Sequence, residues 1–280
     1  MKFSNALRAS ACAAALILTS QAAFATSVQV TITNNAPTGG VYLTPVWVGF
    51  HDGSFDSYDG GTASAPALEA LVEDGNTGPI SDVFAGTLVG DAVDGRVQGT
   101  LGGGPVAPGQ TVTQTFELSA DGSNQYFSYA SMVLPSNDYY VANGNPFAHS
   151  LASIFNGMVN EIVFNIGTPG TVNDAGTEVN DFATSAGNGL FGLPGGQTGP
   201  NQGADEGGVN ANVVGDPFAG FLNTPAGLDL SLFNFNDSSL YANGIATVRI
   251  SLVNPVPVPA ALPLFAAGLS MLGFMRRKRA

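Results

Sequence analysis

The sequence predicts an all-β protein: an antiparallel β-sandwich of about eight strands with long glycine-rich loops and one short helix. Three observations support this fold class. Short apolar runs with a period of two recur along the chain, turn residues separate them, and 37 of the 280 residues are glycine. Only one stretch has helical spacing, whereas a parallel α/β fold would need a helix between most strands.

The first 25 residues are typical of a secretory signal peptide. Lys2 and Arg8 give a positive start, residues 11–18 are apolar, and Ala23-Phe24-Ala25 forms a small-x-small cleavage motif. Cleavage after Ala25 would also remove Cys12, the single cysteine of the chain. The exported protein would then be stabilised without disulfides, through apolar burial and bound metal.

The predicted domain, residues 26–254, begins with two strands. From Ser27 onward, Val28, Val30 and Ile32 alternate with polar residues, as in a half-buried strand. A second strand, 45–50, contains Trp47, whose ring we expect in the core. The acidic, glycine-rich loop 51–61 follows and lacks the acid spacing of an EF-hand, so it either adds a metal ligand or shapes a cleft.

One helix is predicted after this loop. Ser64 is a suitable N-cap, Leu68, Leu71 and Val72 share one face, and Asp74-Gly75 ends the helix.

The remaining periodic runs are predicted as strands, and the central one organises the rest. These runs are 93–101, 110–118, 126–134, 161–166 and 244–253. The run 126–134 is apolar on both faces, which indicates a central strand. Pro135 has no N–H for a sheet and ends this strand, so Asp138 is expected in a loop at the rim of the sheet.

Three acidic residues form the candidate metal site: Asp138, Asp174 and Glu178. Asp174 and Glu178 flank Gly176, which lets the backbone turn tightly enough for both carboxylates to point at one place. A shared cation would explain this spacing. The alternative is that all three are solvated loop acids.

Four stretches together resemble the spondin amino-terminal domain family, in a bacterial form, over about residues 27–253. They are TPVWVGFHDGSFDSYDGG (44–61), SAPALEALVEDGN (64–76), MVLPSND (132–138) and DAGTEVND (174–181). The resemblance implies an antiparallel sandwich with a divalent cation held by loop acids at one end, and we expect this cation to be Ca²⁺. It places Ser136-Asn137-Asp138 and the run from Asp174 to Glu178 at that ion, with Glu178 standing where the family has aspartate.

The tail, residues 255–280, resembles a PEP-CTERM sorting signal. Val256-Pro257-Val258-Pro259 precedes a 16-residue apolar segment, 260–275, and four basic residues, 276–279. Because a stable span needs about 20 apolar residues, this segment suits a transient inner-membrane anchor. The resemblance implies cleavage by an exosortase and a cell-surface or secreted product; the alternative is a permanent anchor.

Removing both ends would leave two arginines, Arg96 and Arg249, against 21 acids, a net charge of −19. Such a charge repels nucleic acid and attracts divalent cations. No nucleophile elbow or zinc-protease motif is present. The two resemblances imply a module of the extracellular matrix or cell surface, associated with exopolysaccharide or biofilm. Since catalytic motifs are missing, we expect it to be non-catalytic and to bind polysaccharide or a surface protein.

Two questions stay open at this stage. The alternative function is a secreted carbohydrate-active hydrolase that uses loop carboxylates. In the glycine-rich stretch 187–227, Asp205 and Glu206 either add metal ligands or are solvated.

Overall fold

The computed structural model describes residues 25–86, 95–180, 203–219 and 229–253. The predicted signal peptide, except for its last residue, and the whole predicted sorting tail lie outside this part of the chain. Within the described ranges, no helix has both the length and the apolar character needed to cross a bilayer.

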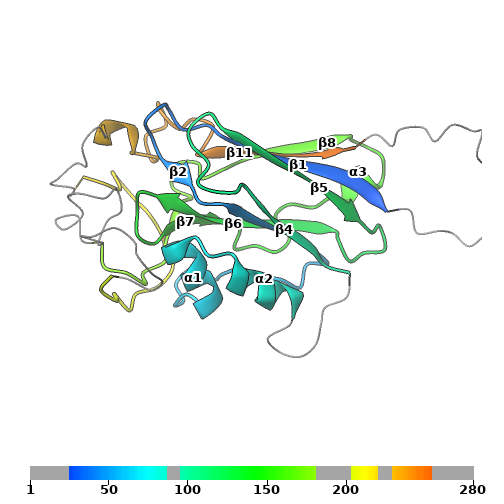
Figure 1. Ribbon diagram of the computed structural model, residues 1–280, viewed down its shortest axis with the longest axis horizontal. Helices are drawn as coiled ribbons and strands as arrows, with labels where there is room; N and C mark the ends of the chain where they lie inside the picture. Colours follow the sequence, from blue (N-terminus) through cyan, green and yellow to red (C-terminus); the bar gives the residue numbers. More distant parts are fainter. Residues whose placement is uncertain (1–24, 87–94, 181–202, 220–228, 254–280) are drawn as a thin grey trace, which may run out of the picture.

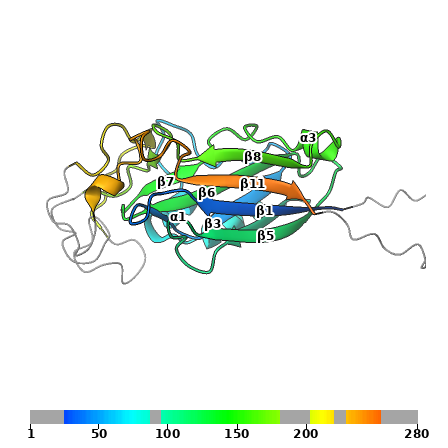
Figure 2. The same cartoon turned by 90° about the horizontal axis from the view of Figure 1, so that it is seen from above.

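The described chain forms two antiparallel sheets, which confirms the predicted all-β sandwich (Figures 1 and 2). The four-stranded sheet has the order β5-β1-β11-β8, and the seven-stranded sheet has the order β10-β9-β7-β6-β3-β4, with β2 paired to β6. The strands are β1 (Thr26–Asn34), β2 (Tyr42–Leu43), β3 (Val46–His51), β4 (Val97–Leu101), β5 (Thr111–Leu118), β6 (Tyr126–Leu134), β7 (Tyr139–Ala142), β8 (Glu161–Ile166), β9 (Asn173–Asp174), β10 (Ala211–Asn212) and β11 (Ala246–Leu252).

The main core lies between the two sheets and follows from the period-two pattern. In β1, Val28, Val30 and Ile32 are fully buried. On the opposite face, the hydroxyl groups of Thr31 and Thr33 contact those of threonines in β5 at 3.2 and 2.9 Å. The four-stranded sheet therefore has one apolar face and one polar face, as expected for the outer layer of a sandwich.

A second core lies on the other face of the seven-stranded sheet. Helices α1 (Pro66–Asp74) and α2 (Gly78–Ala85) cover this face (Figure 1). Trp47 is fully buried there, as predicted, and its ring centroid lies 5.1 Å from that of Phe84. Gly49 makes room for this contact, because a Cβ at that position would lie 2.7 Å from both rings. Strand β6 is thus covered on both faces.

The element boundaries agree closely with the sequence pattern, with three differences. Among the described residues, eight strands have four or more residues. The one that the sequence did not predict is β7, which follows the central strand after a cis Leu134–Pro135 peptide. The described ranges contain three short α-helices, α1, α2 and α3 (Ala152–Phe155), whereas one helix was predicted; they also contain the 3₁₀ turn η1 (Leu230–Leu232). Strand β4 begins at Val97, later than position 93.

Ser64 does not cap α1, contrary to the prediction. Ala65 occupies the N-cap position without a side-chain hydrogen bond, and Pro66 begins the helix. The Ser64 hydroxyl instead donates to Asn210 Oδ1 at 2.8 Å, because a distant glycine-rich segment packs against this loop. The predicted end at Gly75 is confirmed, with φ of 65°.

Candidate metal site

Asp138 lies in the loop between β6 and β7, as predicted, but it is fully buried. The chain after β9 folds over it. The backbone N–H groups of Thr177 and Glu178 donate to Asp138 Oδ2 at 3.1 and 3.2 Å, and Ala175 N–H donates to the Asp138 carbonyl at 3.3 Å. The loop that was expected to share a cation with Asp138 therefore also removes this carboxylate from solvent.

Asp174 lies beside this buried carboxylate. It belongs to β9, where it pairs with Tyr139, the residue after Asp138. Its Oδ1 accepts a hydrogen bond from Gly176 N–H at 2.8 Å, and its Oδ2 accepts one from Asn180 Nδ2 at 2.8 Å. Asp174 thus fixes both the turn at Gly176 and the orientation of the Asn180 amide.

Glu178 is also buried, under a glycine-rich segment. Only 3% of its surface is exposed, and a Cβ at Gly203 would lie 2.5 Å from its Oε1. The segment is attached by backbone hydrogen bonds from Val179 N–H to the Ala204 carbonyl and from Glu206 N–H to the Thr177 carbonyl, at 2.8 and 2.9 Å. Asp205 and Glu206 are themselves exposed. Their backbone covers the site while their side chains face solvent.

Within the part of the chain that the structure describes, four buried side-chain oxygens near these acids have no hydrogen-bond partner. They are Asn137 Oδ1, Asp138 Oδ1, Glu178 Oε2 and Asn180 Oδ1. All four belong to two short stretches, 137–138 and 178–180, which are joined by a hydrogen bond from Asn137 Nδ2 to the Val179 carbonyl at 2.9 Å. Because a buried acceptor without a partner costs about 1–3 kcal/mol, four of them in two adjoining stretches require an explanation.

The pKa shifts of these acids indicate that their negative charges lack a compensating positive charge. Burial raises the pKa of Glu178 to about 8, with a further rise from Glu73 and Asp138. Burial also raises the pKa of Asp138, and the charges of Asp174 and Glu206 raise it further. Glu73, in the last turn of α1, has a pKa raised to about 7, first by burial. Without a cation, burial and mutual repulsion favour the protonated, neutral form of these carboxyl groups.

The available donors fit a hard divalent cation such as Ca²⁺, which prefers carboxylate and amide oxygens. Within the described residues, no group of three or more His, Cys, Asp or Glu side chains is arranged to hold a metal ion. The three-carboxylate set Asp138, Asp174 and Glu178 therefore stays a prediction. The potential metal ligands without a hydrogen-bond partner are two carboxylate oxygens and two amide oxygens.

A second buried polar cluster, formed by His51, Ser128 and Asn143, lies where β3 and β6 pair. His51 Nε2 lies 2.9 Å from Ser128 Oγ, a distance that suits a nucleophile and its base. However, Gly53 N–H donates to His51 Nδ1 at 3.0 Å, so the neutral ring carries its proton on Nε2. His51 then donates to Ser128 and cannot accept its proton, so this cluster is not an activated serine.

None of the protein-family models compared with the chain matches it, and no curated protein shows significant similarity. The resemblance to spondin domains and to a PEP-CTERM signal thus stays a prediction.

Sequence reasoning missed three residues of this site. Asn137 lies inside the quoted motif, but its amide oxygen was not recognised as a donor. Asn180 lies two residues after Glu178, inside the quoted stretch DAGTEVND, and its amide oxygen is a type of ligand that a search restricted to acids omits. Glu73 lies next to Val72, at the edge of the apolar face of α1. It is only 4% exposed, and the helical spacing of the sequence did not predict this burial.

Proposed function

We propose that this chain is an exported β-sandwich, stabilised by Ca²⁺, that acts as an interaction module at the cell surface or in the extracellular matrix. The observation that supports it best is the group of four buried oxygens without partners on Asn137, Asp138, Glu178 and Asn180. A calcium ion takes six to eight oxygen ligands and supplies the missing positive charge.

Each residue has a distinct role in this proposal. Asp138 and Glu178 provide negative charge, and Asn137 and Asn180 provide neutral oxygens that add ligands without added repulsion. Asp174 orients Asn180 through the 2.8 Å hydrogen bond and adds to the field at Asp138. Neutralising these charges would hold the 176–180 loop against the end of β6.

Equilibrium binding of Ca²⁺ to the purified full chain tests the proposal. Extracellular calcium modules bind with Kd of about 0.1–1 mM, and we expect one site in this range. Mg²⁺ requires tighter octahedral geometry and gives up water reluctantly, so we expect it to bind more weakly. The absence of a saturable site for Ca²⁺ would refute the proposal.

The proposed export and processing rest on the two terminal segments, residues 1–25 and 255–280. Four basic residues after the apolar segment would hold the tail in the cytoplasm, so that Val256 to Pro259 lies at the outer face of the membrane. There an exosortase could cut. Intact-mass analysis from a native host should find a chain that begins at Thr26 and lacks residues from about Pro259 onward; a dominant surface form that retains Ala280 would exclude processing.

A further inference from the structure

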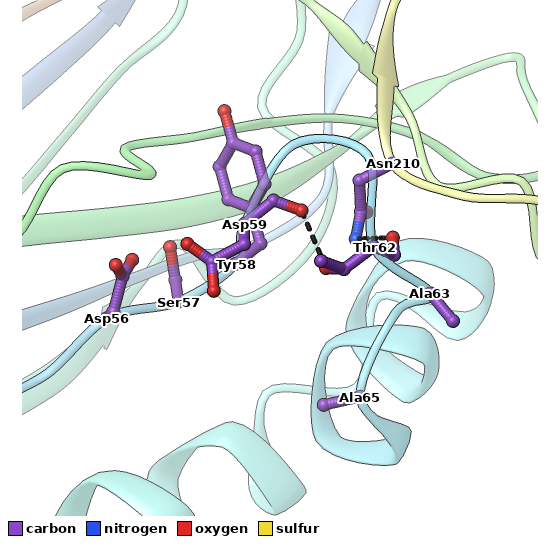
Figure 3. A pocket seen from close by; sticks show the side chains of 8 residues that line it. All are labelled: Asp56, Ser57, Tyr58, Asp59, Thr62, Ala63, Ala65 and Asn210. Atoms are coloured by element: carbon purple, nitrogen blue, oxygen red, sulfur yellow. Dashed lines mark hydrogen bonds between the residues drawn. The ribbon is translucent and has the colours of Figure 1, made fainter.

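A polar pocket of about 210 Å³ lies beside the metal-site region, where the loop 56–65 enters α1 (Figure 3). Asp56, Ser57, Tyr58, Asp59 and Thr62 line it from this loop. Asn210 lines it from the glycine-rich segment. Because pockets for drug-sized ligands measure about 300–1,000 Å³, this one suits a smaller unit such as a single ring.

Asn210, which lines the pocket from the glycine-rich segment, is held in place by several hydrogen bonds. Asn210 is 1% exposed, its backbone N–H and its Nδ2 both donate to the Thr62 carbonyl at 2.8 and 2.9 Å, and its carbonyl accepts from Gly61 N–H at 2.8 Å. Its Oδ1 accepts hydrogen bonds from the hydroxyls of Ser64 and Tyr140, both at 2.8 Å. The pocket is thus bounded by an ordered, fully bonded residue from a distant part of the chain.

The hydroxyls of Ser57 and Thr62 in the lining already donate to the protein, and the Tyr58 hydroxyl accepts a hydrogen bond from Asn173 Nδ2 at 2.9 Å. The Ser57 hydroxyl donates to the Asn143 carbonyl at 2.8 Å, and the Thr62 hydroxyl donates to the Asp59 carbonyl at 2.7 Å. Asp56 and Asp59 therefore dominate what the pocket presents to a ligand. The pocket offers acceptors and negative charge, with the methyl groups of Ala63 and Ala65 as its apolar part.

No cationic side chain of the described chain compensates these two acids. Its two basic residues are engaged elsewhere: Arg96 donates to the Phe84 carbonyl and to Ser54, and Arg249 pairs with Glu161. Partial burial raises the pKa of Asp56, and the charge of Asp59 raises it further. A cationic ligand would relieve this repulsion.

From the pocket and its acceptor-rich lining, we infer that it binds one amino-sugar unit with a free, protonated amine. Asp56 and Asp59 would accept hydrogen bonds from the ammonium and an adjacent hydroxyl, and the alanine methyl groups would contact the sugar ring. A Ca²⁺ ion is a poorer fit, because it takes six to eight oxygen ligands and makes no use of the alanine methyl groups that line this pocket. A lysine side chain from a protein is slender and would leave much of this open pocket empty.

Binding of small, defined probes to the full chain in saturating Ca²⁺ tests the inference. The probes are the β-1,4-linked disaccharide of glucosamine, its N,N′-diacetylated form and lysine amide, each titrated at fixed ionic strength and at a pH where the amines are charged. We expect saturable binding of the free-amine disaccharide and much weaker binding of the other two. Equal binding of the diacetylated form, tighter or equal binding of lysine amide, or no binding of the disaccharide would overturn the assignment.

Matched variants separate the pocket from the general charge of the chain. Asp56→Asn and Asp59→Asn should each weaken binding of the disaccharide roughly tenfold to hundredfold, because a hydrogen bond to a charged group contributes about 1.5–3 kcal/mol. Asp121→Asn, the same change on an acid outside the pocket, should leave binding unchanged. Equal losses in all three variants would mean diffuse attraction and would overturn the inference.

Discussion

Two buried polar clusters on the same sheet differ in how completely their atoms are bonded. In the cluster of His51, Ser128 and Asn143, every side-chain nitrogen and oxygen has a partner. In the cluster around Asp138 and Glu178, four oxygens have no partner among the residues that the structure describes. The first cluster is complete by itself, whereas the second has the donors for a cation and the excess charge that a cation would neutralise.

The same difference appears in protonation. Burial lowers the pKa of His51 to about 4, so the ring is neutral and its network uncharged. Burial raises the pKa of Glu178 to about 8, so near neutral pH this carboxyl lies close to its titration point. A buried network can be stable when it is neutral and fully bonded; a buried anionic cluster requires protons or a cation.

The largest expected effect comes from the glycine that closes the loop over Asp138. Gly176 has φ of 63°, and a Cβ there would lie 2.6 Å from Val209 N. Gly176→Ala should lower the free energy of unfolding by about 2–5 kcal/mol, through left-handed backbone strain and overpacking. It should also weaken both calcium binding and the Asn210 wall of the pocket.

Gly170→Ala is the matched control for this change. Gly170 has φ of 80° but no heavy atom within 4 Å of an added Cβ, so it carries the backbone strain alone, about 1–2 kcal/mol. Chemical denaturation of both variants measures the difference. Equal losses would show that the contact with Val209 has no energetic role.

Breaking the fully bonded cluster should be costly and independent of calcium. His51→Ala leaves a cavity and removes the partner of the buried Gly53 N–H, so we expect a loss of about 2–4 kcal/mol. Denaturation in Ca²⁺ and in chelator should give the same loss. A loss that depends on calcium would contradict the separation of the two clusters.

Replacing one anion of the metal site should have opposite effects with and without calcium. In Asp138→Asn, the amide oxygen can still accept from Thr177 and Glu178 N–H, but one buried charge is gone. Without calcium at pH 8, we expect a gain of about 1–2 kcal/mol. With calcium, the variant should show no further stabilisation, whereas Asp229→Asn should respond like the native chain; identical behaviour of the two variants would indicate diffuse charge screening.

The stability of the metal-free chain should also depend on pH in a defined way. Because the pKa of Glu178 is raised in the folded state, the folded chain binds more protons than the unfolded chain from about pH 4.5 to 8, and stability falls as pH rises through this window. The lowered pKa of His51 acts oppositely and removes stability as pH falls from about 6.5 to 4. The raised pKa values of Glu73 and Asp138 act in the same direction as that of Glu178. Thermal melts in chelator should therefore show stability falling from about pH 6.5 to 8, above the range in which His51 titrates; a steady rise over this range would contradict it.

The sequence predicts the fold better than it predicts the site. Strands β6 and β8 match the predicted runs because their boundaries are set by local signals, such as Pro135 after Leu134. The burial of Asp138 could not be predicted, because it depends on residues 174–179 and 203–208, which are distant in sequence and meet only in the fold. The same holds for Asn210, which completes a pocket that begins at Asp56.

The account depends most directly on whether a cation occupies the unpartnered oxygens of Asn137, Asp138, Glu178 and Asn180. The decisive measurement is the melting temperature of the full chain at pH 8 and at pH 5, each in about 1 mM Ca²⁺ and in chelator. At pH 8, calcium should add roughly 0.4–1.4 kcal/mol, a rise of about 1–5 °C. At pH 5 the rise should be smaller, because protons compete for Glu178. Identical melts in calcium and chelator at pH 8 would contradict the account.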